Sequence, residues 1–169
     1  MSIPTSIFFH FLPIFTLYAT IVLMKLIEQL QADFGQFSFV ADEECRWSPE
    51  ENTIFYTDGE EIDLFHELGH ALCQHKSFVQ DIELLHIERD AWEKAREIAA
   101  KYGVKITDEQ IENALDGYRD WLHQRSSCPN CDQTGLQRRS DGRYECFNCG
   151  TVWTANDARK CGLKRVRVI

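Results

Sequence analysis

The sequence has little positive charge outside its C-terminal part. It holds 18 Lys and Arg residues against 27 Asp and Glu, which gives a formal net charge of −9. Between residues 42 and 67 there are ten acidic residues and a single basic one, Arg46. A surface of this sign repels the phosphates of DNA and RNA, so the main part of the chain is not expected to bind nucleic acid.

A disulfide framework is also missing. The chain has seven Cys, an odd number; four of them form two Cys-x-x-Cys pairs, and the other three are scattered without pair spacing. Thiols used in this way are typical of a reducing compartment and not of a secreted protein. We therefore predict a cytoplasmic protein.

The first 24 residues contain no charged side chain. A signal peptide is disfavoured, because it needs a positively charged start and a small-residue cleavage site, and neither is present. The apolar run 7–24 is near the shortest length that spans a membrane, so residues 1–23 would act as an anchor if they are retained. We favour a third interpretation, in which Met24 is the true start and opens an amphipathic helix by itself.

The sequence does contain enough apolar residues for a packed core, since 44% of its 169 residues are hydrophobic. The pattern predicts an α+β fold, with a small main domain of short strands and about four helices, followed by a small second module. The predicted parts are the extension 1–23, the main domain 24–125, the module 126–156 and a basic tail 157–169.

Hydrophobic periodicity predicts the elements of the main domain. Helices are expected at 24–34, 61–75, 81–102 and 108–124, and strands at 36–40 and 53–57. A capping box is predicted at the start of the last helix, with Thr107 as the N-cap and Gln110 at the third helical position. An acidic loop should join the two strands.

The chain is organised around the stretch Phe65-His66-Glu67-Leu68-Gly69-His70, which contains a His-Glu-x-x-His motif on a predicted helix. Two histidines four residues apart lie on one face of a helix, so both imidazoles can reach one metal ion. Zinc suits these donors, and Glu67 should face its open coordination position, where a water binds. We predict His66 and His70 as ligands of a catalytic zinc and Glu67 as the general base. Gly69 inside the helix suggests that another element approaches closely.

A catalytic zinc needs a third protein ligand. The extended motif with a third histidine is excluded, because Cys73 and Lys76 stand where it needs Gly and His. His75, five residues beyond His70, is expected to be exposed or satisfied by another group. The next helix offers four candidates, which cannot all face the site: Glu83, His86, Glu88 and Asp90.

A family resemblance narrows this choice. The region from the second strand through the motif to Glu88-Arg89-Asp90-Ala91-Trp92 resembles the ImmA/IrrE-type zincin-like metallopeptidases, in which the motif is followed by Glu-x-Glu-Ala-x-x-Phe-Ala. Ala95 matches the final Ala, whereas Lys94 replaces the Phe and the family's Leu-Leu-Met-Pro stretch is absent. The resemblance covers about half of the chain.

The resemblance implies that Glu88 is the third zinc ligand. The residues agree, since Glu88 leaves the apolar side chains of its helix free to pack. Asp90 and His86 remain alternatives, and Asp90 is otherwise predicted to hold a ligating imidazole in place.

A second metal site is predicted from Cys128-Pro129-Asn130-Cys131 and Cys146-Phe147-Asn148-Cys149, two pairs separated by fourteen residues. Together they resemble a zinc ribbon with rubredoxin-like knuckles. Since four thiolates fill every position around a tetrahedral ion, this zinc is structural and stabilises a module too small to fold by core burial alone. The predicted ligands are Cys128, Cys131, Cys146 and Cys149.

Two roles for this ribbon stay open. It would either stabilise the main domain or dock a protein or nucleic-acid partner. Arg138, Arg139, Arg143 and the basic tail give the second role some support, although the tail is more simply interpreted as solvated.

The motifs together predict a zinc metalloendopeptidase that hydrolyses peptide bonds of a protein substrate with zinc-activated water. Strand 53–57 would hold the substrate by strand addition, or belong to a plain hairpin. Tyr118, Arg119 and His123 are candidates to stabilise the oxyanion. The alternative function is a non-enzymatic adaptor that binds two metal ions and recruits its partner through the ribbon.

Overall fold

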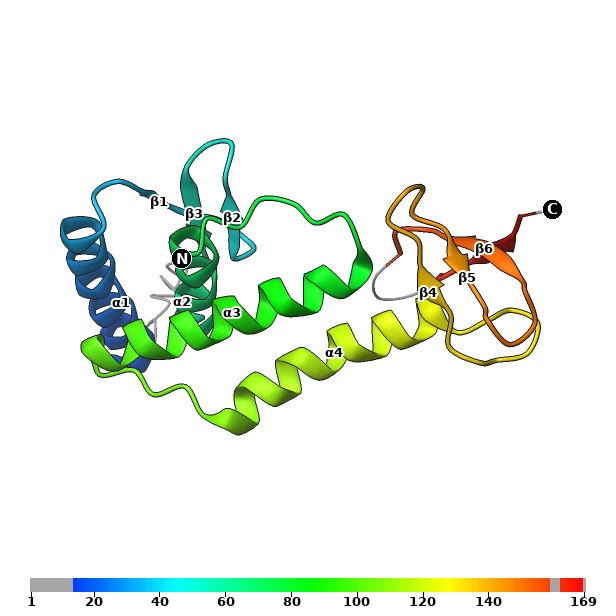
Figure 1. Cartoon of the computed structure of the whole chain (residues 1–169). Coiled ribbons are helices and arrows are strands. Elements are labelled where there is room, and N and C mark those ends of the chain that lie inside the picture. Colours follow the sequence, from blue (N-terminus) through cyan, green and yellow to red (C-terminus); the bar gives the residue numbers. More distant parts are fainter. Residues whose placement is uncertain (1–13, 159–161, 169) are drawn as a thin grey trace, which may run out of the picture.

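The computed structural model describes residues 14–158 and 162–168, with side chains from residue 23 onward. This part of the chain has four α-helices, one short 3₁₀ helix and seven short strands (Figure 1). The predicted α+β class is therefore confirmed. Residues 1–13 of the predicted N-terminal extension lie outside the described residues.

Helix α1 (Ile14–Asp33) begins well before Met24, so the predicted helix start at Met24 is wrong. The apolar face predicted for it is present, and its buried members are Leu26, Ile27 and Leu30. The helix ends at Asp33, close to the predicted end at residue 34. In the described part of the chain, no helix combines the length and the apolar character that crossing a membrane requires.

Three further helices form most of the main domain: α2 (Glu61–Leu72), α3 (Asp81–Ala99) with the 3₁₀ turn η1 (Ala100–Tyr102), and α4 (Asp108–Ser126). Helices α3 and α4 run antiparallel along each other (Figure 1). The capping box of α4 forms as predicted, because the Thr107 hydroxyl accepts from the Gln110 amide at 3.2 Å and the Gln110 side chain accepts from the Thr107 amide at 2.9 Å. Helix α2 ends three residues before the predicted His75.

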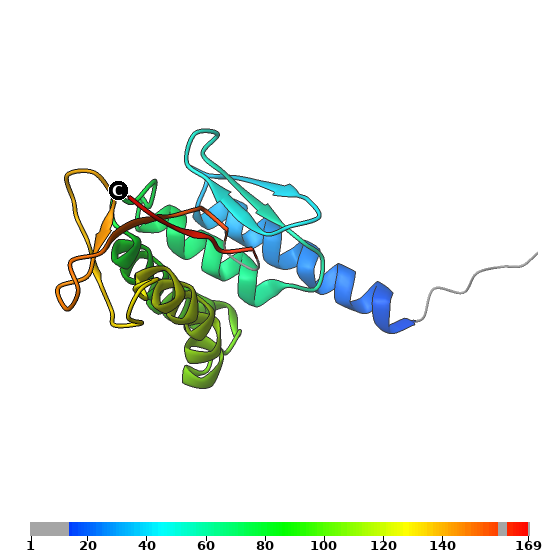
Figure 2. The same cartoon turned by 90° about the vertical axis from the view of Figure 1, so that its right-hand side faces the viewer.

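A three-stranded sheet lies over α1 and α2 (Figure 2). Strand β1 (Ser38–Ala41) pairs in parallel with β3 (Thr53–Tyr56), and β2 (Arg46–Ser48) pairs antiparallel on the other side of β3. The two predicted strands therefore do not form a hairpin with each other; β3 forms one with β2 instead. Strand β3 is also the central strand, so it has no open edge to hold a substrate, and the edge next to α2 belongs to β2, inside the predicted acidic loop.

Gly69 lies where α2 crosses α3. A Cβ atom at this position would stand 2.3 Å from the Ala91 carbonyl oxygen, so the two backbones are in direct contact. The close approach predicted from this glycine is confirmed, and the approaching element is α3, the helix that carries Glu88. The small residue therefore sets the distance between the two helices that supply the candidate metal ligands.

Gly69→Ala is expected to destabilise the protein. Overpacking typically costs about 1–3 kcal/mol, which outweighs the roughly 1 kcal/mol that Ala gains over Gly inside a helix. The matched control is Gly117→Ala in α4, where nothing lies within 4 Å of the added Cβ and the change should stabilise. Urea denaturation of both variants measures the difference, and equal stabilisation by the two substitutions would contradict the close contact.

The second module is a four-stranded antiparallel sheet at the end of the molecule where α3 begins and α4 ends (Figure 1). Its strands are β4 (Leu136–Gln137), β5 (Tyr144–Glu145), β6 (Val152–Ala155) and β7 (Arg165–Arg167). The residues of β7, in the predicted solvated tail 157–169, are exposed, but they pair with β6 and so extend the sheet of the second module. The arginines of β7 also bind backbone carbonyls of the first cysteine loop, at Ser127 and Pro129.

Candidate metal centres

Helix α2 holds the two histidines of the His-Glu-x-x-His motif rigidly. The apolar residues between and around them are buried in the core and include Leu64, Phe65, Leu68 and Ala71. His66 and His70 are themselves only 7% and 9% exposed. Their Nε2 atoms lie 3.1 Å apart, as expected for residues four positions apart on one helix face.

Glu88 of α3 completes the cluster. Its Oε2 lies 3.1 Å from His66 Nε2 and 3.4 Å from His70 Nε2, and its side chain is buried. Burial alone would raise the pKa of Glu88, but the hydrogen bonds and charges of the two imidazoles outweigh it and lower that pKa to about 2. Three donor atoms that converge at this spacing can hold a metal ion.

The other candidates on α3 lie elsewhere. His86 is exposed, and Glu83 accepts hydrogen bonds from the backbone amides of Val79 and Gln80 at the start of the helix. The Asp90 carboxylate is exposed and lies 3.3 Å from the Arg89 guanidinium. The prediction that Asp90 holds a ligating imidazole in place is therefore wrong. Two residues along a helix correspond to a rotation of about 200°, so Glu88 and Asp90 point to nearly opposite sides.

Glu67 lies beside the two histidines and contacts the edge strand β2. Its Oε2 accepts a hydrogen bond from the Trp47 backbone amide at 2.6 Å. Burial raises the pKa of Glu67, although the charges of His66 and His70 and the Trp47 amide partly oppose this. No sequence pattern indicates the Trp47 contact, because a three-residue strand is too short for a recognisable alternation.

The two imidazoles are supported in different ways. The His66 ring stacks on Trp92, with centroids 4.1 Å apart, and no described residue hydrogen-bonds to its Nδ1. His70 Nδ1 instead lies 3.0 Å from His75 Nδ1. His75 thus has a hydrogen-bonding partner, as predicted. That partner is His70, one of the candidate metal ligands. Burial and the neighbouring His70 lower the pKa of His75.

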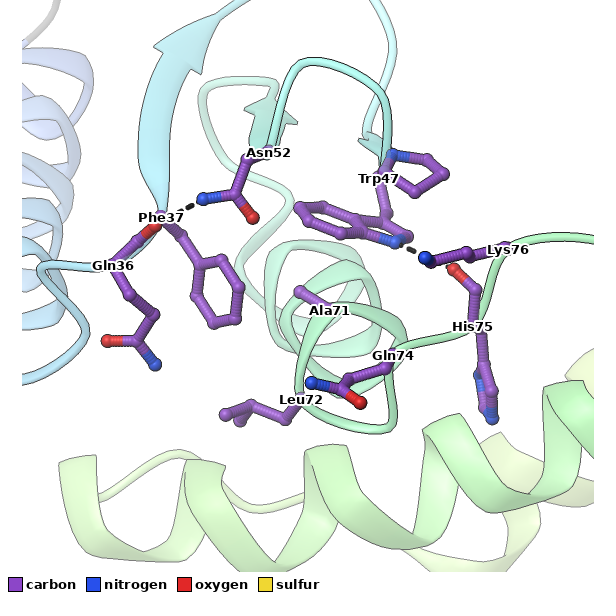
Figure 3. Close-up of a pocket in the computed structure, with 10 residues that line it drawn as sticks. Gln36, Phe37, Trp47, Asn52, Ala71, Leu72, Gln74, His75 and Lys76 are labelled. Carbon is purple, nitrogen blue, oxygen red and sulfur yellow. Dashed lines mark hydrogen bonds between the residues drawn. The ribbon is translucent and has the colours of Figure 1, made fainter.

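An open cleft of about 400 Å³ contains these groups, and its other walls include Arg46 and Trp47 of β2 and Tyr118 of α4. Of the predicted oxyanion stabilisers, only Tyr118 lines the cleft, since Arg119 pairs with Glu112 and Asp116 and His123 is exposed at the end of α4. A neighbouring hollow of about 450 Å³ meets the cleft at Trp47 (Figure 3).

The four predicted cysteines form a second cluster, with Sγ–Sγ separations of 3.4–3.6 Å. The two loops have the same geometry. Asp132 and Gly150, each directly after the second Cys of its pair, have positive φ angles of 56° and 71°, and each donates its amide to the carbonyl of the first Cys. This cluster can also bind a metal ion, and its fold is compatible with a zinc ribbon.

A buried polar cluster joins this module to the main domain. Asp81, the first residue of α3, accepts hydrogen bonds from Arg125 Nε and from the Tyr144 hydroxyl, both at 2.5 Å. Arg125 also donates to the Asn156 carbonyl, while its own carbonyl accepts from the Trp153 indole at 3.0 Å. Asp81 and Arg125 are each only 5% exposed, so their ion pair lies in the protein interior.

Comparison with known proteins adds no family. No family model matches the chain, and no solved structure matches it significantly. The relation to the ImmA/IrrE-type peptidases therefore stays a prediction. The two candidate metal centres are a His-His-Glu cluster in an open cleft and a four-cysteine cluster in the second module. A function is inferred from their side chains.

Proposed function

We propose that the protein is a zinc-dependent metallopeptidase that hydrolyses peptide bonds of a protein substrate. The observation that carries the proposal is the convergence of the His66, His70 and Glu88 donor atoms in an open cleft, with the Glu67 carboxylate beside them. A cluster that served only to stabilise the fold would have no need of an open cleft or of a fourth, separate carboxylate. The sequence resemblance to zincin-like peptidases points the same way.

The donor set fits zinc. A tetrahedral zinc ion with bonds of about 2.0–2.1 Å holds nitrogen and oxygen donors about 3.3–3.4 Å apart. The three separations here are 3.1, 3.1 and 3.4 Å. Three protein donors leave one coordination position open, which is typical of catalytic zinc. When bound, the ion would lower the pKa of water and polarise the carbonyl of the substrate.

Glu67 would move the proton. Its Oε2 accepts the Trp47 amide hydrogen, which fixes the orientation of the carboxylate against β2. We assign to Oε1 the proton that the attacking water loses, and Glu67 then passes it to the leaving amine. Tyr118 lines the same cleft, where its hydroxyl can approach the developing charge on the carbonyl oxygen.

The cleft also suggests how a substrate lies. Strand β2 has β3 on one side only among the described residues. Its Trp47 amide already donates to Glu67, so an extended peptide on the other edge would pair with the Trp47 carbonyl, close to Glu67. An adjoining hollow of about 350 Å³ is lined by Glu44, Glu60 and Asp63. Carboxylates there would attract Lys and Arg side chains, so we propose a preference for basic residues near the cleaved bond.

Removal of the metal is expected to abolish cleavage of a degenerate peptide library by the purified protein. A strong chelator followed by dialysis should stop the reaction, and added Zn²⁺ should restore it, because His66, His70 and Glu88 position a soft-to-borderline ion. Mg²⁺ is the control, since it prefers all-oxygen octahedral sites and should not restore activity. Cleavage that persists in metal-free protein would contradict the proposal. A zinc-loaded protein that cleaves no peptide would favour the alternative function, a non-enzymatic adaptor.

A further inference from the structure

His75 is placed against a candidate metal ligand by the way helix α2 ends. After Leu72 the chain makes a left-handed turn, in which Gln74 has a φ of 56°. The Gln74 amide donates to the Ala71 carbonyl at 3.1 Å and the His75 amide to the His70 carbonyl at 3.0 Å. This hydrogen-bond pattern is the Schellman motif, which usually has Gly at the left-handed position. Here a residue with a side chain occupies it.

The turn is also held from the opposite side by the edge strand. The Trp47 indole Nε1 donates to the His75 carbonyl at 3.0 Å, and the His75 ring points away from that indole (Figure 3). A left-handed residue other than Gly costs about 1 kcal/mol or more and persists only where its surroundings fix it. Trp47 and the helix end therefore fix the His75 backbone in a conformation that brings its ring to His70.

The two rings meet through their Nδ1 atoms. These lie 3.0 Å apart, with the ring planes inclined at 70°. His70 Nε2 faces His66 and Glu88, so it is the nitrogen that would bind the metal. A neutral imidazole that binds a metal through Nε2 carries its hydrogen on Nδ1. Two lone pairs at this distance would repel each other, so His75 Nδ1 must be the acceptor and its own hydrogen must be on Nε2.

We propose that His75 is a positioning residue for the metal ligand His70. Its Nδ1 accepts the hydrogen of His70 Nδ1, which fixes both the tautomer and the rotation of the ligating ring and keeps Nε2 directed at the metal. Partners of this kind on a ligating imidazole are usually carboxylates or carbonyls. In this protein a second imidazole takes that place. The inference rests on the metal site of the proposed function, but not on peptide hydrolysis.

The test is metal affinity at the His-His-Glu cluster, measured with Co²⁺ in the full-length protein. Co²⁺ bound by thiolates absorbs strongly in the near ultraviolet and Co²⁺ bound by nitrogen and oxygen does not, so the two centres can be titrated separately. His75→Ala is expected to weaken binding at His66, His70 and Glu88 by about 10–100-fold. His75→Asn should restore most of the affinity, because its Oδ1 replaces Nδ1 as the acceptor.

Gln74→Gly is the matched control, since it keeps the turn and should bind Co²⁺ as tightly as the wild type. Unchanged affinity in His75→Ala, or equal weakening in His75→Ala and His75→Asn, would overturn the proposal. Nitrogen-15 NMR of the zinc-loaded wild type tests it without a variant. A proton on His70 Nδ1 with a coupling across to His75 Nδ1 is expected, and a proton on His75 Nδ1 would refute it.

The two proposals fail separately. If His75→Ala loses metal affinity but the wild type cleaves no peptide, His75 keeps its positioning role and the peptidase function is wrong. If the wild type cleaves peptides and His75→Ala binds metal normally, the peptidase stands and the role of His75 is wrong.

Discussion

Glu67→Gln is expected to abolish peptide cleavage while both metal ions stay bound. The amide has nearly the shape of the carboxylate, and its oxygen can still accept the Trp47 hydrogen bond that holds Glu67 against β2. It cannot accept a proton from water. Loss of a general base typically lowers the rate by about 10²–10⁴-fold, and that reduction should fall on kcat, since no ligand of the metal is changed.

Two controls make this result specific. Glu61→Gln removes a carboxylate from the first turn of the same helix α2, away from the cleft, and should leave kcat unchanged. Metal analysis should find the same metal content in the wild type and both variants, because the donors of the two clusters are intact. A Glu67→Gln variant that cleaves at the wild-type rate would show that another group takes the proton.

The parts of the two centres that could be predicted are those fixed by short-range spacing. A helix places residues four apart on one face, which is enough to bring His66 next to His70. Each Cys-x-x-Cys loop likewise defines its own geometry within a few residues. Glu88 needed more, because its approach depends on how α2 and α3 cross, and only the resemblance and the packing of α3 singled it out before the structure did.

The parts that could not be predicted depend on contacts between distant segments. Strand β2 has three residues and becomes visible only through its pairing with β3. The role of its Trp47 follows from that pairing. His75 was predicted to be exposed or satisfied by another group, at the end of a helix that reaches residue 75. The contact with His70 itself could not be predicted, because it depends on the left-handed turn at Gln74. No sequence rule places a Schellman turn at a Gln with any reliability, since Gly is the residue that favours it.

The junction between the ribbon and the main domain bears on what the ribbon does. Asp81 begins α3 about two helical turns before Glu88. Through Arg125 and Tyr144 it connects that helix end to the end of α4 and to the ribbon sheet. The Gln137 side chain accepts from the Asp81 amide as well, at 2.6 Å. These buried contacts favour the interpretation of the ribbon as a module that stabilises the main domain, in particular the helix that carries Glu88.

Asp81→Ala is therefore expected to destabilise the folded protein by about 3–5 kcal/mol, because it leaves the Arg125 guanidinium buried without its charged partner. Both side chains are almost wholly buried, at 6% and 7% exposure, so solvent screens the pair little. Urea denaturation of the zinc-loaded protein measures the loss. The start of α3 should loosen as well, and a Co²⁺ titration should then show weaker binding at the His-His-Glu cluster.

Most of the stability lost in Asp81→Ala should come from the unpaired charge of Arg125. A double substitution separates this contribution from the loss of packing contacts. Asp81→Leu with Arg125→Met removes both charges, and replacement of a buried ion pair by apolar residues is often close to neutral. It should recover a large part of the stability lost in Asp81→Ala. Lys94→Ala, which breaks an exposed pair with Glu97 on the same helix, should leave the urea midpoint nearly unchanged. A loss in Asp81→Ala no larger than in Lys94→Ala would mean that the ribbon does not hold α3 in place, and the docking role would then be favoured.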